Sequence, residues 1–403
     1  MHLPLSFKHI TAAAALALGG LAVAQAADAP PVRIGYAISK TGPYAGGANV
    51  TTLPNYELWA HEVNAAGGLK LADGKRARIE LIEYDDRSSS EEAVRAIERL
   101  INQDKVDFVL PPWGTALNLA VGPIFDRHGY PQLAVTSVSD RIPQLRDRWP
   151  NAFFFSSTSA AYAEGIADVL DGLRKDGKIK GTVAMVNVAD QFGIELANAA
   201  RKRLEDAGFD IVYRQSYPPG SQDMQTIINE VRRLNPDAFL AFSYPPDTIA
   251  LTDLAIQLKL NTPVFYTAVG TAFPLFKQRF GDNAEGVMGT GGVNVNTEAM
   301  KHYIERHKAV TGKDPDRWLS AITYASLQVL QQAIEKVGKP DRAAVAKAMT
   351  EGTYDTVVGP MTLANRHYEQ GWLVGQWQKG EFHAIAPKRD GVATVEFPKP
   401  NWR

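Results

Sequence analysis

The chain has 403 residues, 45% of them hydrophobic and 22% charged, and its 43 Lys and Arg residues nearly balance its 44 Asp and Glu residues. This length exceeds what one hydrophobic core usually holds, so two domains are expected, and the balanced charge argues against a nucleic-acid partner or a lipid-surface role. The absence of cysteine excludes disulfides, thiolate metal sites, a cysteine nucleophile and lipid attachment through a cysteine.

The N-terminus has the pattern of a secretory signal peptide. Lys8 and His9 precede an apolar run over residues 10–24, which ends in Ala24-Gln25-Ala26. A run of about 15 residues is shorter than the roughly 20 that span a bilayer. We therefore expect residues 1–26 to be removed, so that the mature chain begins at Ala27 in the periplasm.

The first part of the mature chain alternates predicted strands and helices. Residues 32–38 form a strand, a small-residue loop follows over 39–47, and a helix covers 51–65. A second strand covers 78–84, and serines 88–90 cap the next helix. Residues 106–110 and 130–138 then read as two buried parallel strands joined by a crossover helix.

The two strands at 106–110 and 130–138 suggest a binding site. Trp113, Gly114 and Thr115 follow the first strand, and Thr136, Ser137 and Val138 end the second. In an open parallel sheet, ligands bind beyond the carboxyl ends of the strands. Helix caps and strand-end turns account equally well for either end alone. The two ends together favour a cleft.

A second series of strands and helices begins near residue 160. Strands are predicted at 182–188, 211–217, 237–242 and 262–267, with helices between them. A weak internal repeat links the two series: a strand, a Pro-rich turn, a helix and a proline in the next strand occur at 106–110 and Pro131 and again at 236–240 and Pro263. This repeat indicates two lobes of similar topology. Both lobes are predicted to be doubly wound α/β. Helices at 298–311, 318–337 and 342–350 and strands at 373–377 and 382–386 follow, so the chain passes between the lobes more than once.

Catalytic and cofactor signatures are missing from the sequence. It contains no Gly-x-Ser-x-Gly elbow and no His-Glu-x-x-His motif. His302 and His307 are five residues apart, which favours a solvated helix face over a metal site. We therefore expect no metal, no cofactor and no enzymatic activity; an extracytoplasmic hydrolase would need a nucleophile–base pair. Aromatic and hydrogen-bonding residues do recur at predicted strand ends, as in a small-molecule pocket: Tyr44, Trp113, Thr115, Thr136, Ser137, Gln191, Phe192 and Tyr244.

Several segments resemble the periplasmic solute-binding proteins of ABC importers, of the leucine/isoleucine/valine-binding type. The similar segments span nearly the whole mature chain and occur in the family's order: residues 39–45, 64–68, 84–87, 190–193, 324–327, 357–361 and 376–380. The resemblance implies a periplasmic binding protein type I fold. Two α/β lobes, 27–154 plus 289–373 and 155–288 plus 374–403, would be joined by a three-crossover hinge near 153–156, 286–289 and 373–375.

The resemblance also implies a ligand site between the lobes. Thr115 and the segment 136–138 would hold a ligand carboxylate, helped by backbone amides at helix N-termini, and Phe192 and Tyr244 would cover the ligand from the second lobe. The full expected set is Tyr44, Trp113, Gly114, Thr115, Thr136, Ser137, Val138, Gln191, Phe192, Tyr244 and Gly270.

One departure from the family concerns the ligand amine. Amino-acid binders of this type carry an acidic residue after the strand at 262–267, where this chain has Ala268-Val269-Gly270. A buried ammonium without a carboxylate costs several kcal/mol. Either Asp190 replaces the acid, or the ligand is an aromatic or apolar acid without an amine. We expect a monomeric receptor that delivers a small carboxylate, or a branched-chain or aromatic amino acid, to a membrane permease; the alternative is a ligand-sensing subunit with the same fold.

Overall fold

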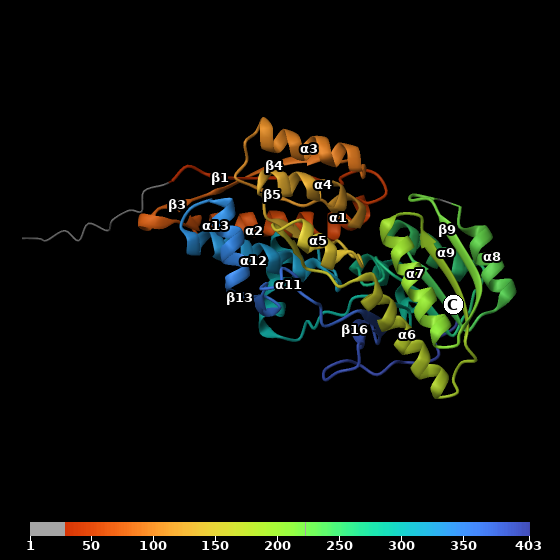
Figure 1. Ribbon diagram of the computed structural model, residues 1–403. Coiled ribbons are helices and arrows are strands. Elements are labelled where there is room, and N and C mark those ends of the chain that lie inside the picture. The colour runs from red at the N-terminus through yellow and green to blue at the C-terminus, as the bar shows by residue number, and fades with distance from the viewer. Residues whose placement is uncertain (1–28, 222) are drawn as a thin grey trace, which may run out of the picture.

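The computed structural model describes residues 29–221 and 223–403. The predicted signal peptide lies outside them. Figure 1 shows two α/β lobes side by side, one built mainly from the N-terminal part of the chain and from α11–α13, the other from the middle of the chain. The predicted fold class, two doubly wound lobes, is confirmed.

The first lobe has a parallel sheet. Its strands run in the order β4-β1-β5, and β6, which contacts β5, continues in a parallel pair with β7. The strands are β1 (Val32–Ile38), β4 (Ile79–Asp85), β5 (Phe108–Leu110), β6 (Gln132–Ala134) and β7 (Ala152–Phe154). The helices are α1 (Ala45–Thr51), α2 (Leu53–Ala65), α3 (Ser90–Asn102), α4 (Thr115–His128) and α5 (Ile142–Arg148), and a small hairpin joins β2 (Leu69–Lys70) to β3 (Arg76–Ala77) around the 3-10 turn η1 (Ala72–Gly74).

The second lobe has one sheet in the order β16-β15-β12-β11-β10-β8-β9, in which only β15 and β16 are antiparallel to their neighbours. Its strands are β8 (Thr182–Val188), β9 (Asp210–Tyr217), β10 (Ala238–Phe242), β11 (Val264–Thr267), β12 (Met288–Thr290), β15 (Val374–Gln378) and β16 (Glu381–Ala386). Its helices are α6 (Ser159–Lys175), α7 (Gln191–Asp206), α8 (Gln225–Leu234), α9 (Pro245–Gln257) and α10 (Pro274–Phe280), followed by the 3-10 turn η2 (Gly281–Ala284).

The two lobes repeat one topology. In each, the first strand of the lobe lies between the second and the third, and the fourth and fifth follow outward, as in β4-β1-β5 with β6-β7 and in β9-β8-β10-β11-β12. The internal repeat read from the sequence falls on equivalent strands, because β5 and β10 are the third strands of their lobes and β6 and β11 the fourth. The Pro-rich turns after β5 and β10 therefore occupy corresponding places.

The C-terminal third of the chain returns to the first lobe before it ends in the second. Helices α11 (Glu298–Thr311), α12 (Ser320–Val337) and α13 (Arg342–Glu351) and the hairpin β13 (Thr353–Thr356) and β14 (Gly359–Thr362) precede β15. Tyr303 of α11 donates to Asn55 of α2 at 2.7 Å, and Trp59 of α2 donates to Gln331 of α12 at 3.2 Å. The predicted lobe boundaries stay a proposal, and the pairing of β12 carries the second sheet to Thr290, past the predicted boundary at Gly289.

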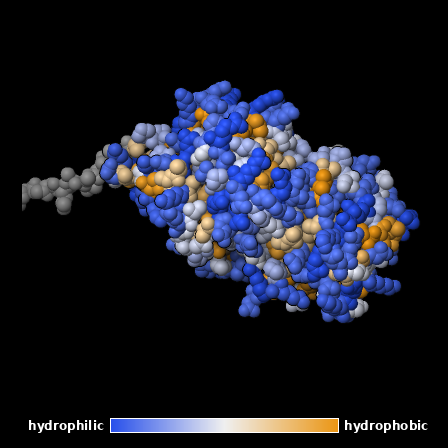
Figure 2. Space-filling view, viewed as in Figure 1, coloured by the Kyte–Doolittle hydropathy of each residue, from blue (hydrophilic) through white to orange (hydrophobic). Residues whose placement is uncertain are grey.

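Local sequence signals explain where five of the helices begin. Ser89, Thr158, Asp190, Thr297 and Asp341 cap α3, α6, α7, α11 and α13 by accepting from a backbone N–H three residues on. His307 corrects one expectation, because it is fully buried and its Nδ1 lies 2.8 Å from the Lys313 carbonyl rather than on a solvated face. Within the described ranges, no helix has both the length and the apolar content to cross a membrane. The face seen in Figure 2 is mostly hydrophilic, with scattered apolar residues.

Candidate functional site

The loops that carry the predicted site follow the innermost strands of both sheets. In the first lobe the second strand, β4, lies on one side of β1 and the third, β5, on the other, so the strand order reverses between β1 and β5. In the second lobe it reverses in the same way between β8 and β10. In doubly wound sheets such a switch point is where ligands bind, at the carboxyl ends of the strands. Tyr44 follows β1, Trp113 follows β5, Phe192 follows β8 and Tyr244 follows β10.

Four aromatic rings from these loops form one cluster. The Tyr244 ring stacks on Phe192, with centroids 4.9 Å apart, and meets Trp113 and Tyr44 edge-on at 5.2 Å each. Tyr44 and Trp113 are 5.9 Å apart. All four side chains are buried. Because two rings come from each lobe, the structure brings the two switch points together in an apolar interlobe seam, which we call the aromatic cluster.

Asp190 lies at the polar edge of the aromatic cluster. Its Oδ2 accepts from the Tyr44 hydroxyl at 3.0 Å and from the Tyr244 hydroxyl at 2.8 Å, and its Oδ1 accepts from the Gly193 amide at 3.1 Å. Burial raises the pKa of the Asp190 carboxyl above its ordinary value, and the hydrogen bonds from Gly193 and the two tyrosines partly oppose that rise. One carboxylate oxygen thus joins tyrosines of opposite lobes.

In the first lobe, threonine hydroxyl groups join the loop after β5 to the loop after β6 by hydrogen bonds. Thr115 Oγ1 accepts from the Val138 amide at 3.0 Å, and Thr136 Oγ1 accepts from the Gly114 amide at 2.8 Å. Gly114 has φ of +92°, a conformation that favours glycine, and no side chain caps α4. The first amides of a helix have no partner within it, so the N-terminus of α4 offers backbone donors to an anion.

Two buried donors near these loops have no hydrogen-bond partner among the described residues. They are the indole Nε1 of Trp113 and the hydroxyl of Ser137, both fully buried. Buried polar groups are normally paired. These two are therefore available to a polar group of a ligand.

The segment after β11 has no space for a side chain at Gly270. Gly270 has φ of +109°, and a Cβ there would stand 2.8 Å from the Pro245 Cα. Ala268 and Val269 are fully buried, and their amides bond to the carbonyls of β10 residue Ala241 and of Ser243. An acidic side chain does not fit at Gly270 in this packing.

A second polar contact between the lobes was not predicted from the sequence. Glu195 of α7 accepts from the Ser139 hydroxyl at 3.1 Å and from the Asp140 amide at 2.9 Å, both in the loop after β6. The side chain of Gln191 donates to Glu195. The four-residue spacing of Gln191 and Glu195 was the signal that could have indicated one helix face toward the other lobe.

The structure therefore brings together most of the predicted site. Tyr44, Trp113, Phe192 and Tyr244 share one seam, and Thr115, Thr136 and Val138 share one loop network beside it. Gln191 and Gly270 occupy supporting positions, the first bonded to Glu195 and the second packed against Pro245.

Comparisons with known proteins agree with this architecture. The family model described as "Periplasmic binding protein" matches residues 31–381. A Brucella abortus protein named Leu/Ile/Val-binding protein homolog 7 is 23% identical, over 97% of this chain and all of that one. A branched-chain amino acid transporter substrate-binding protein of Streptococcus pneumoniae, in complex with isoleucine, has a TM-score of 0.74 at 19% identity and covers 92% of this chain and 100% of that one. A solute-binding protein of an R. palustris ABC transporter, in complex with benzoate, also has a TM-score of 0.74, at 18% identity, covering 92% and 97%.

Proposed function

Because this chain belongs to the periplasmic binding protein family, we propose that it is an extracytoplasmic receptor of an ABC importer. It captures a small carboxylate between its lobes and delivers it to the membrane permease. The observation that carries the proposal is the meeting of the two switch points: Tyr44 and Tyr244, from opposite lobes, bond to one oxygen of Asp190. A cleft closed by contacts to both lobes suits a protein that traps a solute by hinge motion.

The carboxylate end of the ligand is assigned to the first lobe. The uncapped N-terminus of α4 supplies backbone amides, the donors that anions prefer at helix ends. The Thr115 hydroxyl, which here donates to the Val138 carbonyl at 3.2 Å and accepts from the Val138 amide, would exchange the carbonyl for the ligand. The apolar body of the ligand is assigned to the aromatic cluster. Trp113 Nε1 and Ser137 Oγ, which have no partner among the described residues, provide further donors.

We infer that an aromatic or apolar acid without an amine fits better than an amino acid. Gly270 leaves no space for the acidic side chain that would pair with an ammonium. Asp190 already accepts from Tyr44, Tyr244 and the amides of Phe192 and Gly193, and a carboxylate has about four acceptor positions. The solved relatives in complex with isoleucine and with benzoate make both ligand classes reasonable for this fold.

A thermal-shift screen tests this assignment. Benzoate, hydroxybenzoates and phenylpropanoid acids are compared with leucine, isoleucine, valine and phenylalanine. A ligand at 100 times its dissociation constant stabilises a protein by about 2.7 kcal/mol. We expect stabilisation by aromatic acids. Stabilisation by leucine or valine alone would show that Asp190, or another group, binds an ammonium after all.

We propose that the mature receptor begins at Ala27 and is a monomer in the periplasm. The sequence Ala24-Gln25-Ala26 of the full chain supports cleavage after Ala26. The mass of the exported protein and its light-scattering molar mass test the two statements. Retention of residues 1–26 would contradict cleavage after Ala26, and a stable dimer would contradict the monomeric state.

A further inference from the structure

A cavity of about 520 Å³ lies near the predicted hinge, and none of the four rings of the aromatic cluster lines it. Its walls come from both sides of the chain crossings: Arg146 belongs to α5 of the first lobe, and Thr158 caps α6, the first helix of the second lobe. Residues 365–369, which lead toward β15, complete it with Asn365, His367 and Tyr368.

The segment that forms one wall of the hinge cavity is hydrogen-bonded to the first crossover, near residues 153–156. The amide of Phe154 donates to the Arg366 carbonyl at 2.9 Å, and the amide of Tyr368 donates to the Phe154 carbonyl at 2.8 Å. The ring Nε2 of His367 lies 2.9 Å from the Ser156 carbonyl. Residues 366–368 therefore move with the end of β7 and with the chain that enters the second lobe.

The charged side chains that line this cavity are the guanidinium of Arg146 and the exposed carboxylate of Glu369, and Arg366 lies in the same wall segment without lining the cavity. Arg146 and Arg366 each donate to a backbone carbonyl, of Asn365 at 2.6 Å and of Trp149 at 3.0 Å, and within the described residues neither pairs with a carboxylate. Burial, and then the charge of Arg146, lower the pKa of Arg366. The acid nearest the His367 ring, Glu369, is 3.9 Å from its Nδ1 and has a side chain 83% exposed.

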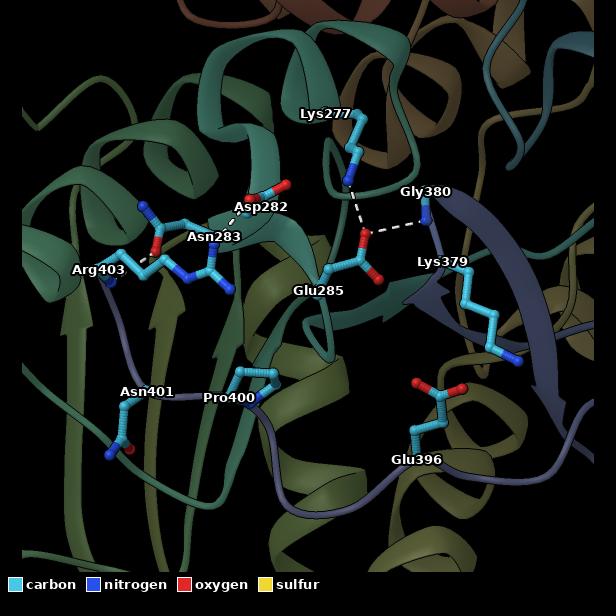
Figure 3. Close-up of a pocket in the computed structure, with 10 residues that line it drawn as sticks. All are labelled: Lys277, Asp282, Asn283, Glu285, Lys379, Gly380, Glu396, Pro400, Asn401 and Arg403. Carbon is cyan, nitrogen blue, oxygen red and sulfur yellow. Dashed lines mark hydrogen bonds and ion pairs between the residues drawn. The ribbon is translucent and has the colours of Figure 1, made fainter.

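A second cavity, of about 560 Å³ on the second lobe, is different (Figure 3). There Lys277 pairs with Glu285 at 2.6 Å, and Arg403 pairs with Asp282 at 2.8 Å. Glu285 also accepts from the Gly380 amide at 2.9 Å. With Lys379 and Glu396 the lining has three basic and three acidic residues, so this cavity has no preference for either sign of ligand. What distinguishes the hinge cavity is the Nε of Arg146, a buried donor with no hydrogen-bond partner among the described residues.

We propose that the hinge cavity is a second binding site for a small oxyanion, either inorganic phosphate or sulfate or a carboxylate. The Arg146 guanidinium has further N–H groups beyond the one bonded to Asn365, and guanidinium pairs well with planar or tetrahedral oxyanions. The hydroxyl groups of Thr158 and Tyr368 line the same space. A bound anion joins α5 of the first lobe to the start of α6 in the second, and so favours one hinge angle.

The test is thermal unfolding with chloride replaced stepwise by phosphate, sulfate or acetate at constant ionic strength. The natural protein should show a saturable rise in melting temperature with at least one of these anions. Comparing the phosphate and acetate series tells whether the site prefers a tetrahedral oxyanion or a carboxylate. In Arg146→Gln the apparent anion affinity should fall at least tenfold, whereas Arg146→Lys should retain part of it. Arg148→Gln, on the same helix at an exposed position, should respond like the natural protein.

The same titration separates this site from the cleft. Thr115→Ala, which alters the proposed carboxylate site, should keep the full response to phosphate and sulfate. Loss of the response in Thr115→Ala, an equal response in Arg146→Gln, or no saturable effect of any of the three anions would overturn the proposal. If Arg146→Gln does not fold, the titrations of the natural protein and of Thr115→Ala still decide.

Discussion

Tyr44 of the first lobe and Asp190 of the second are joined by a hydrogen bond of 3.0 Å between the phenol oxygen and Oδ2. Residues that are 146 positions apart in the chain thus meet in the seam between the lobes. Tyr244 bonds to the same oxygen from within the second lobe. Because this contact joins the two lobes, it should contribute to the closed form directly.

Removing the hydroxyl of Tyr44 should favour the open form. In Tyr44→Phe the ring remains in the aromatic cluster, but a hydrogen bond to a charged acceptor, worth about 1.5–3 kcal/mol, is lost. Small-angle X-ray scattering without ligand should give a larger radius of gyration than for the natural protein. Tyr84→Phe is the matched control, because it loses a 2.9 Å bond to Asp104 inside the first lobe. Equal radii for Tyr44→Phe and the natural protein would argue against an interlobe role.

Glu195 should act as a second closure contact. Glu195→Ala removes the acceptor for Ser139 and Asp140, which should weaken the closed form by about 1–2 kcal/mol. The ligand found in the screen should then dissociate about tenfold faster in stopped-flow measurements. Glu205→Ala, on the same helix and paired with the surface residue Arg201, should leave that rate unchanged. A similar acceleration in both variants would contradict a specific role for Glu195.

Asp247 should make the stability depend on pH. Burial raises the pKa of this carboxyl from 3.8 to about 6. The folded state then holds the proton more tightly than the unfolded chain, so this group lowers the free energy of unfolding as the pH rises from about 4 to about 6. Asp247→Asn removes that loss, and its stability relative to the natural protein should improve by about 2–3 kcal/mol between pH 4 and pH 7.

Urea unfolding at pH 4, 5, 6 and 7 measures the effect of Asp247. Thr252→Ala, on the same helix, is the control: it loses a hydroxyl bonded to the Thr248 carbonyl and no titratable group, so its difference from the natural protein should stay constant with pH. A difference between Asp247→Asn and the natural protein that stays constant with pH would contradict the assignment.

Trp402 should anchor the C-terminal segment. The side chain is 5% exposed, its ring lies edge-on to Phe265 at 5.2 Å, and the Lys399 ammonium stands 3.5 Å from the ring centre. Trp402→Ala should therefore cost about 3–5 kcal/mol of stability. Urea unfolding tests this, with Arg403→Ala, which loses one exposed ion pair, expected to cost under about 1 kcal/mol. Equal losses would mean that Trp402 does not anchor the segment.

Periodicity predicts the long elements well and the short ones poorly. The strands at 32–38 and 182–188 and the helix at 298–311 have the predicted ends. Helices α5 and α10 were not predicted, because each has only seven residues and a proline in its first turn, which reads as a loop. Helix α1 was also missed, since Gly46 and Gly47 suggest a turn.

Gly47 shows why tertiary contacts escape sequence reasoning. A Cβ at this position would lie 2.1 Å from the Trp113 ring, so glycine is required by packing and not by a turn. The site loops were predictable because strand ends in α/β sheets collect ligand contacts. The convergence of Tyr44 and Tyr244 on Asp190 depends on how the lobes are placed, which no local pattern indicates.

The dissociation constant of an aromatic carboxylate for Thr115→Ala tests the central claim most directly. If the Thr115 hydroxyl and the α4 N-terminus hold the ligand carboxylate, calorimetric titration with benzoate or a hydroxybenzoate should show binding to the natural protein. The variant should bind more weakly by about 1–3 kcal/mol, or roughly 5- to 150-fold. Thr323→Ala, which loses a buried hydroxyl bonded to Leu319 far along the chain in α12, should keep the natural affinity. Unchanged affinity in Thr115→Ala, or binding of leucine and valine with none of the aromatic acids, would contradict the account.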